Sequence, residues 1–146
     1  MKKILSFILA AILMALPMCV QANAEGEVNY DDLVAPCFTY LNSVSSGISE
    51  SALGFVTCTS AAICLDSGLT IELTCELQRT DGTQAWVAYK SKTETFTNTS
   101  GGAYVIEKNW FAPANYAYRV KTTVVVKNSS GKVLESATLN SNVLYK

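Results

Sequence analysis

The stretch LTIELTCELQ, residues 69–78, alternates apolar and polar side chains without a break. In an extended chain its five apolar residues share one side and its five polar residues share the other. A period of two predicts a β-strand with one face in a core and one face in water. The rest of the chain can be interpreted from this strand outward.

A second strand of the same kind is predicted at residues 116–127. Its apolar face consists of Tyr116, Tyr118, Val120, Thr122, Val124 and Val126. Basic residues and Thr123 dominate the other face, with Val125 as the exception. This strand is therefore also expected to be half buried.

Turn residues recur at short intervals, as in Asp81-Gly82 and Ser100-Gly101-Gly102. They divide the chain into expected strands at Tyr40–Ile48, Leu53–Ile63, Leu69–Arg79, Gln84–Tyr89, Thr93–Asn98, Ala103–Trp110, Tyr116–Lys127 and Lys132–Leu139. Short strands at this spacing, with no helical pattern, favour an all-β fold. We expect an antiparallel immunoglobulin-like β-sandwich of about seven or eight strands. A small barrel is the alternative.

The first residues carry a different signal. A basic head at residues 1–3 precedes an apolar run from Ile4 to Val20, and a small-x-small pattern ends at Ala24. This is the layout of a secretory signal peptide. A membrane anchor is the alternative, but the run contains Pro17 and is shorter than the roughly 20 residues of a spanning helix. We expect cleavage after Ala24 and no membrane span in the mature chain.

Cleavage would divide the chain into a signal peptide (1–24), an extended N-terminal leader (25–39) and a β-sandwich domain (40–146). Nine basic and twelve acidic residues remain, so the mature charge is −3 and no basic patch indicates nucleic acid. Lipidation at Cys19 is disfavoured, because Met18 stands where that chemistry needs a small residue. The protein is expected to be secreted to the extracellular space as a monomer.

Four cysteines remain in the mature chain: Cys37, Cys58, Cys64 and Cys75. An even number in an exported chain is typical of a disulfide framework, and four cysteines allow three connectivities. Zinc is disfavoured, because the sequence has neither a Cys-x-x-Cys motif nor any His.

Two arrangements of the strands around Asp66-Ser67 would bring Cys58 and Cys75 together. In a tight hairpin the register sets Cys58 opposite Cys75 and keeps one face apolar. In two opposed sheets the same side chains can meet across the core. We expect the bridge Cys58–Cys75 in either case, which leaves Cys37–Cys64 to tie the leader to the body.

Charge is unevenly distributed along the chain. Residues 25–76 hold eight acidic residues and no basic one, whereas residues 77–146 hold nine basic and four acidic residues. One interpretation is a dipolar surface that steers a charged partner. We prefer cross-strand pairing, because the third and sixth strands of such a sandwich are neighbours. This would place Glu72 and Glu76 beside Arg119 and Lys121.

Short motifs follow one another along the chain: Thr57-Cys58, Leu77-Gln78-Arg79, Trp86, Tyr118-Arg119-Val120-Lys121, and Ser129-Ser130-Gly131-Lys132 with Glu135. With these motifs, residues 40–145 resemble an uncharacterised family of small exported bacterial proteins. The resemblance implies an immunoglobulin-like sandwich, and it carries over no catalytic or binding residue. Four mature cysteines are more than this pattern usually has. The Tyr118 strand has no cysteine, so the inter-sheet bridge of antibody domains is impossible.

The sequence contains no His, which removes Ser-His-Asp and Cys-His nucleophiles and the commonest metal ligand. Glu72 and Glu76 share a strand face, but four residues separate them by about 13 Å. An inverting glycosidase needs its carboxylates within about 9.5 Å. We therefore expect no enzyme activity, no cofactor and no metal site. A hydrolase built from carboxylates on separate loops is the less favoured alternative.

Aromatic side chains are the remaining candidates for a binding site. Trp110 and Phe111 are adjacent on an expected strand, so one of them should face solvent, and Trp86 is a third candidate. Such residues bind sugar rings or form protein hot spots. The opposing interpretation places most aromatics in the core, with Tyr116 or Tyr118 as a tyrosine corner. We expect a non-enzymatic module that binds an extracellular protein or glycan. A secreted toxin- or inhibitor-like effector is the alternative.

Overall fold

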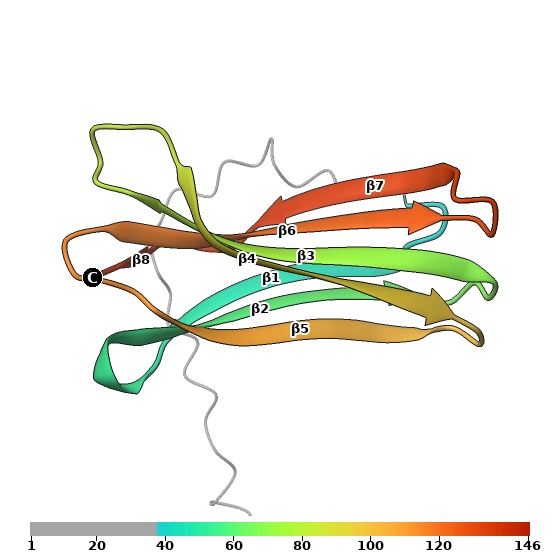
Figure 1. Cartoon of the computed structure of the whole chain (residues 1–146), viewed down its shortest axis with the longest axis horizontal. Helices are drawn as coiled ribbons and strands as arrows, with labels where there is room; N and C mark the ends of the chain where they lie inside the picture. The colour runs from blue at the N-terminus through green and yellow to red at the C-terminus, as the bar shows by residue number, and fades with distance from the viewer. Residues whose placement is uncertain (1–37) are drawn as a thin grey trace, which may run out of the picture. The chain divides into compact units, whose positions relative to one another are not determined.

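The computed structural model describes residues 38–146, so the expected signal peptide, Cys19 and residues 25–37 of the leader lie outside the described residues. The described chain forms two facing antiparallel sheets, which confirms the predicted fold class (Figure 1). The strands are β1 (Ser43–Glu50), β2 (Phe55–Cys64), β3 (Leu69–Thr80), β4 (Val87–Asn98), β5 (Gly102–Phe111), β6 (Ala117–Lys127), β7 (Val133–Asn140) and β8 (Leu144–Tyr145). A short 3-10 turn, η2 (Ala52–Gly54), joins β1 to β2.

The two sheets have the strand orders β1-β2-β5 and β4-β3-β6-β7, with β8 added beside β6. β3 pairs with β6, as predicted for an immunoglobulin-like sandwich. β4 pairs with β3, so the fourth strand belongs to the second sheet, unlike in a constant-type domain. Two separate sheets exclude the barrel alternative for this part of the chain.

β4 corrects the prediction of two strands at Gln84–Tyr89 and Thr93–Asn98. One strand runs from Val87 to Asn98 and pairs with β3 throughout, with one register shift. Residues 90–92 contain no apolar side chain, but they lie on an edge strand whose side chains are mostly exposed on both faces. The sequence prediction also missed β8, because two residues are too few to show a period.

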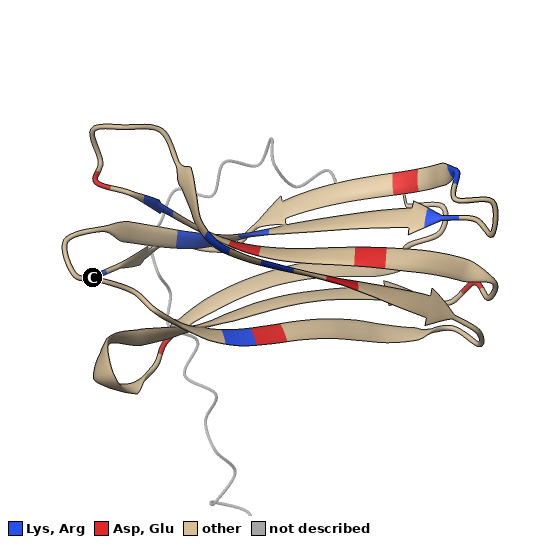
Figure 2. Ribbon diagram, viewed as in Figure 1, with Lys and Arg blue, Asp and Glu red and all other residues tan. Residues whose placement is uncertain are grey.

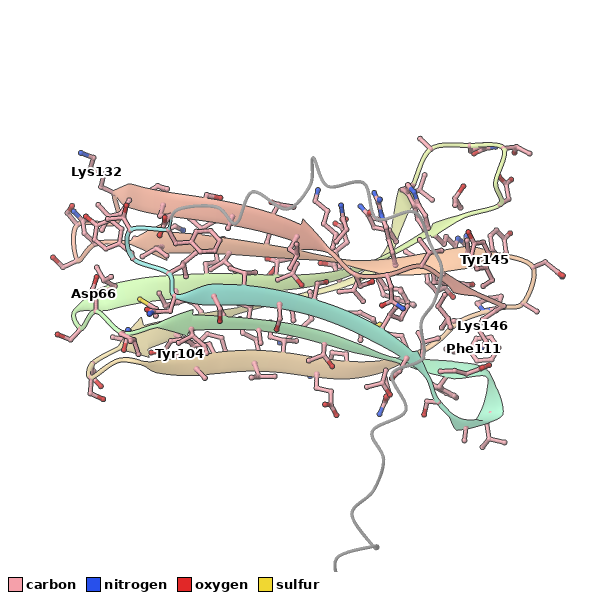
Figure 3. The ribbon with its side chains drawn as sticks, turned by 180° about the vertical axis from the view of Figure 1, so that it is seen from behind. Asp66, Tyr104, Phe111, Lys132, Tyr145 and Lys146 are labelled. Carbon is pink, nitrogen blue, oxygen red and sulfur yellow. The ribbon has the colours of Figure 1, made fainter. Side chains whose placement is uncertain are left out.

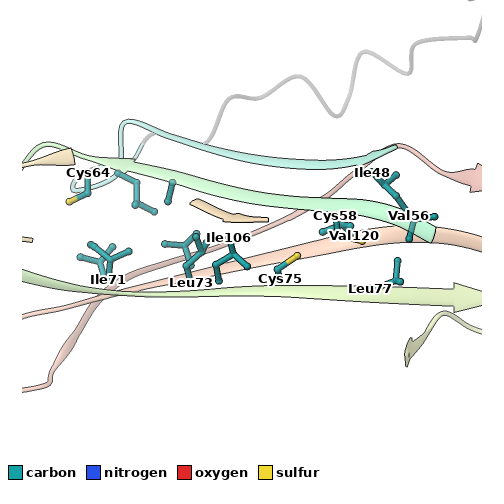
Figure 4. Close-up of a cluster of buried hydrophobic side chains, with 14 of the residues drawn as sticks. Ile48, Val56, Cys58, Cys64, Ile71, Leu73, Cys75, Leu77, Ile106 and Val120 are labelled. Carbon is teal, nitrogen blue, oxygen red and sulfur yellow. The ribbon is translucent and has the colours of Figure 1, made fainter. Parts of the chain in front are cut away.

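The core lies between the sheets and uses the alternation that predicted β3 and β6 (Figure 4). Its largest fully buried aliphatic side chains are Ile71, Leu73, Leu77, Ile106, Val56, Val120, Val124 and Val126. One buried hydrogen bond crosses it, between Ser60 Oγ on β2 and Thr122 Oγ1 on β6, at 2.6 Å. A polar contact therefore joins the two sheets inside an otherwise apolar core.

Tyr118 forms the predicted tyrosine corner. Its hydroxyl donates to the carbonyl oxygen of Pro113 at 2.7 Å, and its side chain is fully buried. Burial is the main reason that the pKa of this phenol is raised. The bond fixes the connection that carries the chain from β5 in the first sheet to β6 in the second.

A carboxylate holds the residues that precede β1. Glu135 on β7 accepts hydrogen bonds from the amides of Thr39, Tyr40 and Leu41, at 2.9, 2.9 and 3.0 Å. Burial raises the pKa of Glu135, but the three amide donors outweigh it, so the pKa lies below its usual value. This side-chain anchor explains why the first strand begins at Ser43 and not at Tyr40.

Asn98 locks two loops together where β4 ends. Its amide donates to the carbonyl oxygens of Cys64 and Asp66, at 3.1 and 2.6 Å, and its oxygen accepts from the Gly101 amide at 2.7 Å. Gly101 has a φ of 78°, and an added Cβ would lie 2.7 Å from the Leu65 carbonyl oxygen. Glycine is therefore required at this position.

Candidate binding surface

The outer face of the second sheet carries the predicted cross-strand charge pairs, with one change (Figure 2). Glu76 lies directly opposite Lys121, as predicted. Glu72 pairs instead with Lys127, whose Nζ lies 2.7 Å from the Glu72 carboxylate. Arg119 is two positions beyond Lys121 and faces Gln78. Basic residues thus lie beside the glutamates within one sheet.

Arg119 covers one of the predicted binding aromatics. Its Nε donates to Gln78 Oε1 at 2.9 Å, and its guanidinium carbon lies 4.4 Å from the centre of the Trp86 ring. Gln78 in turn donates to Glu76 at 2.7 Å. Trp86 is therefore half buried, with one face of its ring covered by a cation.

Trp110 and Phe111 point to opposite faces, as predicted. Trp110 packs against the core, whereas Phe111 is 52% exposed on the outer face of the first sheet. Phe111 contacts Phe55, with ring centres 5.7 Å apart and planes at 72°. Trp86, Trp110 and Phe111 therefore do not form one site, and the sequence interpretation missed Phe55.

We call the outer face of the first sheet the low-charge face. These two phenylalanines lie at one end of it. Its rows across β1, β2 and β5 are Ser43–Ile63–Ala103, Ser45–Ala61–Val105, Gly47–Thr59–Glu107, Ser49–Thr57–Asn109 and Phe55–Phe111. Glu107 is the one charged residue among them. A sheet face with small hydroxyl and methyl side chains and a single charge departs from the charged surface usual for a soluble domain.

A signal for this face is present in the sequence. Residues 38–65 contain one charged residue, Glu50, and they supply both β1 and β2. The charge balance of the two halves of the chain hides this run, because the acidic residues on either side of it dominate the count. Figure 2 shows these two strands almost free of acidic and basic residues.

The η2 turn extends the apolar end of the low-charge face. Leu53 is 90% exposed and has a left-handed φ of 58°, which is uncommon outside glycine. A Cβ added to Gly54 would lie 3.0 Å from the Phe111 ring, so the turn rests on that ring. Figure 3 shows Phe111 and Lys146 at the same end of the sandwich, where the Lys146 ammonium lies 3.7 Å from Glu50.

The cysteines differ from the prediction. β2 and β3 lie in opposite sheets, so the hairpin register for Cys58 and Cys75 is wrong. Both side chains are fully buried between the sheets (Figure 4), and burial, then the neighbouring Cys75, raise the pKa of Cys58 to about 12. Cys58, Cys64 and Cys75 are free thiols in this structure, so the predicted Cys58–Cys75 bridge is not formed in it. Cys37, the predicted partner of Cys64, lies outside the described residues.

Several grooves lie on other parts of the described surface. Two adjoining ones, of about 230 and 190 Å³, share Thr80, Asp81 and Tyr116. A groove of about 340 Å³ between β1 and β7 is lined by Phe38, Val44 and residues 136–139, and none of these is ionisable. Among residues 38–146, no group of three or more Cys, Asp or Glu side chains is placed to hold a metal ion. The same residues include no helix long and apolar enough to cross a membrane.

Comparison with known proteins identifies no family. No family model and no curated protein matches the chain. Two solved structures of Bacteroides uniformis β-glucuronidase show a partial likeness. The form covalently bound to cyclophellitol-6-carboxylate aziridine is 14% identical (TM-score 0.40), and the other is 15% identical (TM-score 0.38). Each match covers 68% of this chain and only 12% of the enzyme, and similarity this weak carries no argument about activity.

Proposed function

We propose that this protein is an exported, non-enzymatic binding module, and that the low-charge face binds a protein. The observation that carries the proposal is the single charge among all outward residues of β1, β2 and β5. Small, uncharged side chains lose little conformational entropy when a partner covers them, and their desolvation costs less than that of charged groups. The Phe55–Phe111 pair at one end would supply the buried aromatic anchor that interfaces use.

The geometry of the aromatic pair favours a protein partner over a glycan. Sugar rings stack on an exposed aromatic plane, but Phe55 and Phe111 meet edge to face at 72° and so present no common plane. The two tryptophans, which would serve better, are half buried beneath Arg119 and against the core. An apolar side chain from a protein would fit against the Phe pair and the η2 turn.

The acidic side chains support binding over catalysis, because several of them are engaged in holding the fold. Glu72 is paired with Lys127, and Glu135 accepts three backbone amides. Asp81 accepts hydrogen bonds from the hydroxyl and the amide of Thr83, and these lower its pKa. The lowered pKa values of Glu135 and Asp81 favour their charged forms, which is the opposite of what a general acid needs.

We also propose that the protein is exported and that Cys58 and Cys75 then form a disulfide bond. In an oxidising compartment each thiol would give up one hydrogen, and the electron pair would reduce the disulfide of a thiol oxidant to two thiols. Intact-mass measurement of the exported protein tests both steps. We expect a chain that starts at Glu25 and is lighter by two hydrogens for each bridge. A start at Met1, or a mass equal to that of the fully reduced chain, would contradict them.

A photo-crosslinking amino acid placed at Thr59 tests the binding surface directly. Thr59 lies in the middle of the central strand of the first sheet, and Thr74 occupies the matching half-buried position on the second sheet. Irradiation of the exporting cells should give protein adducts from position 59 and few from position 74. Equal yields from both positions would remove the support for a binding role of the low-charge face.

A further inference from the structure

We propose that the partner of the low-charge face is the same face of a second copy of this chain, so that two copies form a weak dimer. This inference rests on the proposed function, since it names the protein that the face binds. It replaces the expectation of a monomer. Two β-sheets pack face to face about 10 Å apart when the side chains of the two facing surfaces interdigitate.

The area of the face fits a weak, reversible dimer. Three strands spaced by about 4.8 Å are about 14 Å wide, and the ten residues of β2 span about 34 Å. Each copy would therefore cover about 500 Å², or about 1,000 Å² for the pair, which is the lower end of specific interfaces. Such a dimer should dissociate on dilution and not behave as an obligate one.

The distribution of charge favours a second copy over a charged partner. A partner that brought charged groups to this face would leave them desolvated, because Glu107 is the only charge available to pair with them. A second copy brings the same hydroxyl and methyl groups, which need no countercharge. The face is therefore more complementary to itself than to an ordinary charged protein surface.

The single charge also selects the symmetry of the pair. A two-fold axis perpendicular to the strands, along the middle row of Gly47, Thr59 and Glu107, would place Glu107 opposite Glu107 of the other copy. Like charges directly opposite each other are destabilising. An axis along β2 places β1 of one copy over β5 of the other. Gly47, Thr59 and Glu107 share one row, so each Glu107 would then lie over a glycine that has no side chain. The same axis brings Phe55 of one copy onto Phe55 of the other.

Sedimentation velocity over a concentration series tests the inference. The protein recovered after export should sediment as a monomer at low micromolar concentration and approach twice that mass near millimolar concentration. Thr59→Lys should weaken association at least tenfold, because the dimer would cover two ammonium groups whose one possible partner, Glu107 in the same row, does not repay the cost of desolvating both charges. Thr74→Lys, the matched change on the second sheet, should leave association unchanged. Ser45→Lys on exposed β1 is a second variant on the face, in case Thr59→Lys is poorly folded.

The outcomes separate this inference from the proposed function. A monomer at every concentration, or a dimer indifferent to both Thr59→Lys and Ser45→Lys, would overturn the self-association. If position 59 nevertheless crosslinks to a different protein, the face is a binding surface for that protein and the proposed function stands. If position 59 crosslinks to a second copy and the dimer is lost in both variants, both proposals hold.

Discussion

The outer faces of the two sheets differ although their inner faces follow the same rule. On the outer face of the second sheet Glu72, Glu76, Arg119, Lys121 and Lys127 lie side by side, whereas the outer face of the first sheet has one glutamate across three strands. Both sheets turn alternate apolar residues into the same core. The inward residues therefore determine the fold, and the outward residues differ because the two outer faces have different surroundings. The outer face of the second sheet contacts water, and in our proposal the low-charge face binds another protein.

Leu73→Ala should destabilise both sheets together and lower the unfolding free energy more than the other changes. Leu73 is fully buried between the sheets, so its truncation leaves a cavity and should cost about 2–5 kcal/mol of unfolding free energy. Thr74→Ala, one residue away on the outer face, is the control and should cost about 0.5 kcal/mol. Urea unfolding measures both. A single cooperative transition is expected, and an intermediate with one sheet intact would contradict a shared core.

Thr122→Val tests the polar contact that joins the sheets. The change leaves the buried Ser60 hydroxyl without its 2.6 Å partner, at a cost of about 1–3 kcal/mol. Adding Ser60→Ala should recover much of this loss, because neither polar group then remains unsatisfied. A double-mutant cycle in urea gives the coupling energy. Strictly additive losses would show that the two hydroxyls act independently.

Glu135→Gln should remove the acid sensitivity of the hydrogen bonds that hold residues 39–41 against β7. The folded-state pKa of Glu135 lies below the usual 4.5, so its contribution is present above pH 4.5 and is lost as the pH falls through the folded pKa. The variant should therefore be less stable than the wild type at pH 7, and the difference should shrink below pH 4.5. Thermal unfolding across this pH range measures it. A difference that does not shrink at all down to the pH at which the wild type unfolds in acid would mean that the three amides do not depend on the charge.

Glu72→Gln should have the smallest effect and sharpens the contrast between the faces. Its pair with Lys127 is partly exposed, so the loss should be about 1 kcal/mol or less and should vanish in about 1 M salt. Glu107→Gln on the low-charge face has no ion pair to lose and should show no salt dependence in the monomer. Unfolding in low and high salt distinguishes them. Equal salt dependence would remove the electrostatic difference between the faces.

The alternation at residues 69–78 and 116–127 was sufficient to predict the fold, because burial of one face leaves a period of two in the sequence. The pairing of Glu76 with Lys121 followed from the strand order. The position of Cys58 relative to Cys75 did not follow, because a hairpin and two opposed sheets would place the same apolar residues in the core. The scarcity of charge at residues 38–65 indicates two strands of the low-charge face, but the complete face could not be predicted. It also needs β5 beside β2, whose paired residues are 38 to 56 positions apart.

The aromatics show the same limit. Adjacent positions predicted that one of Trp110 and Phe111 is exposed, but parity alone could not say which. The covering of Trp86 by Arg119 joins residues 33 positions apart, and no local pattern encodes it. Contacts between segments distant in sequence therefore determine which aromatic side chain is exposed to solvent.

The lock at Asn98 has a consequence for how the protein can be produced. Asn98-Thr99-Ser100 has the form of an acceptor for N-linked glycans, yet Asn98 is 1% exposed and its amide donates to two carbonyl oxygens. A eukaryotic secretory host attaches sugar to such sites before the chain has folded. A glycan on this nitrogen could not enter the folded site, so the modified chain could not close the β2–β3 and β4–β5 loops. Production through a route without N-glycosylation, or with Ser100 replaced by alanine, should avoid that loss.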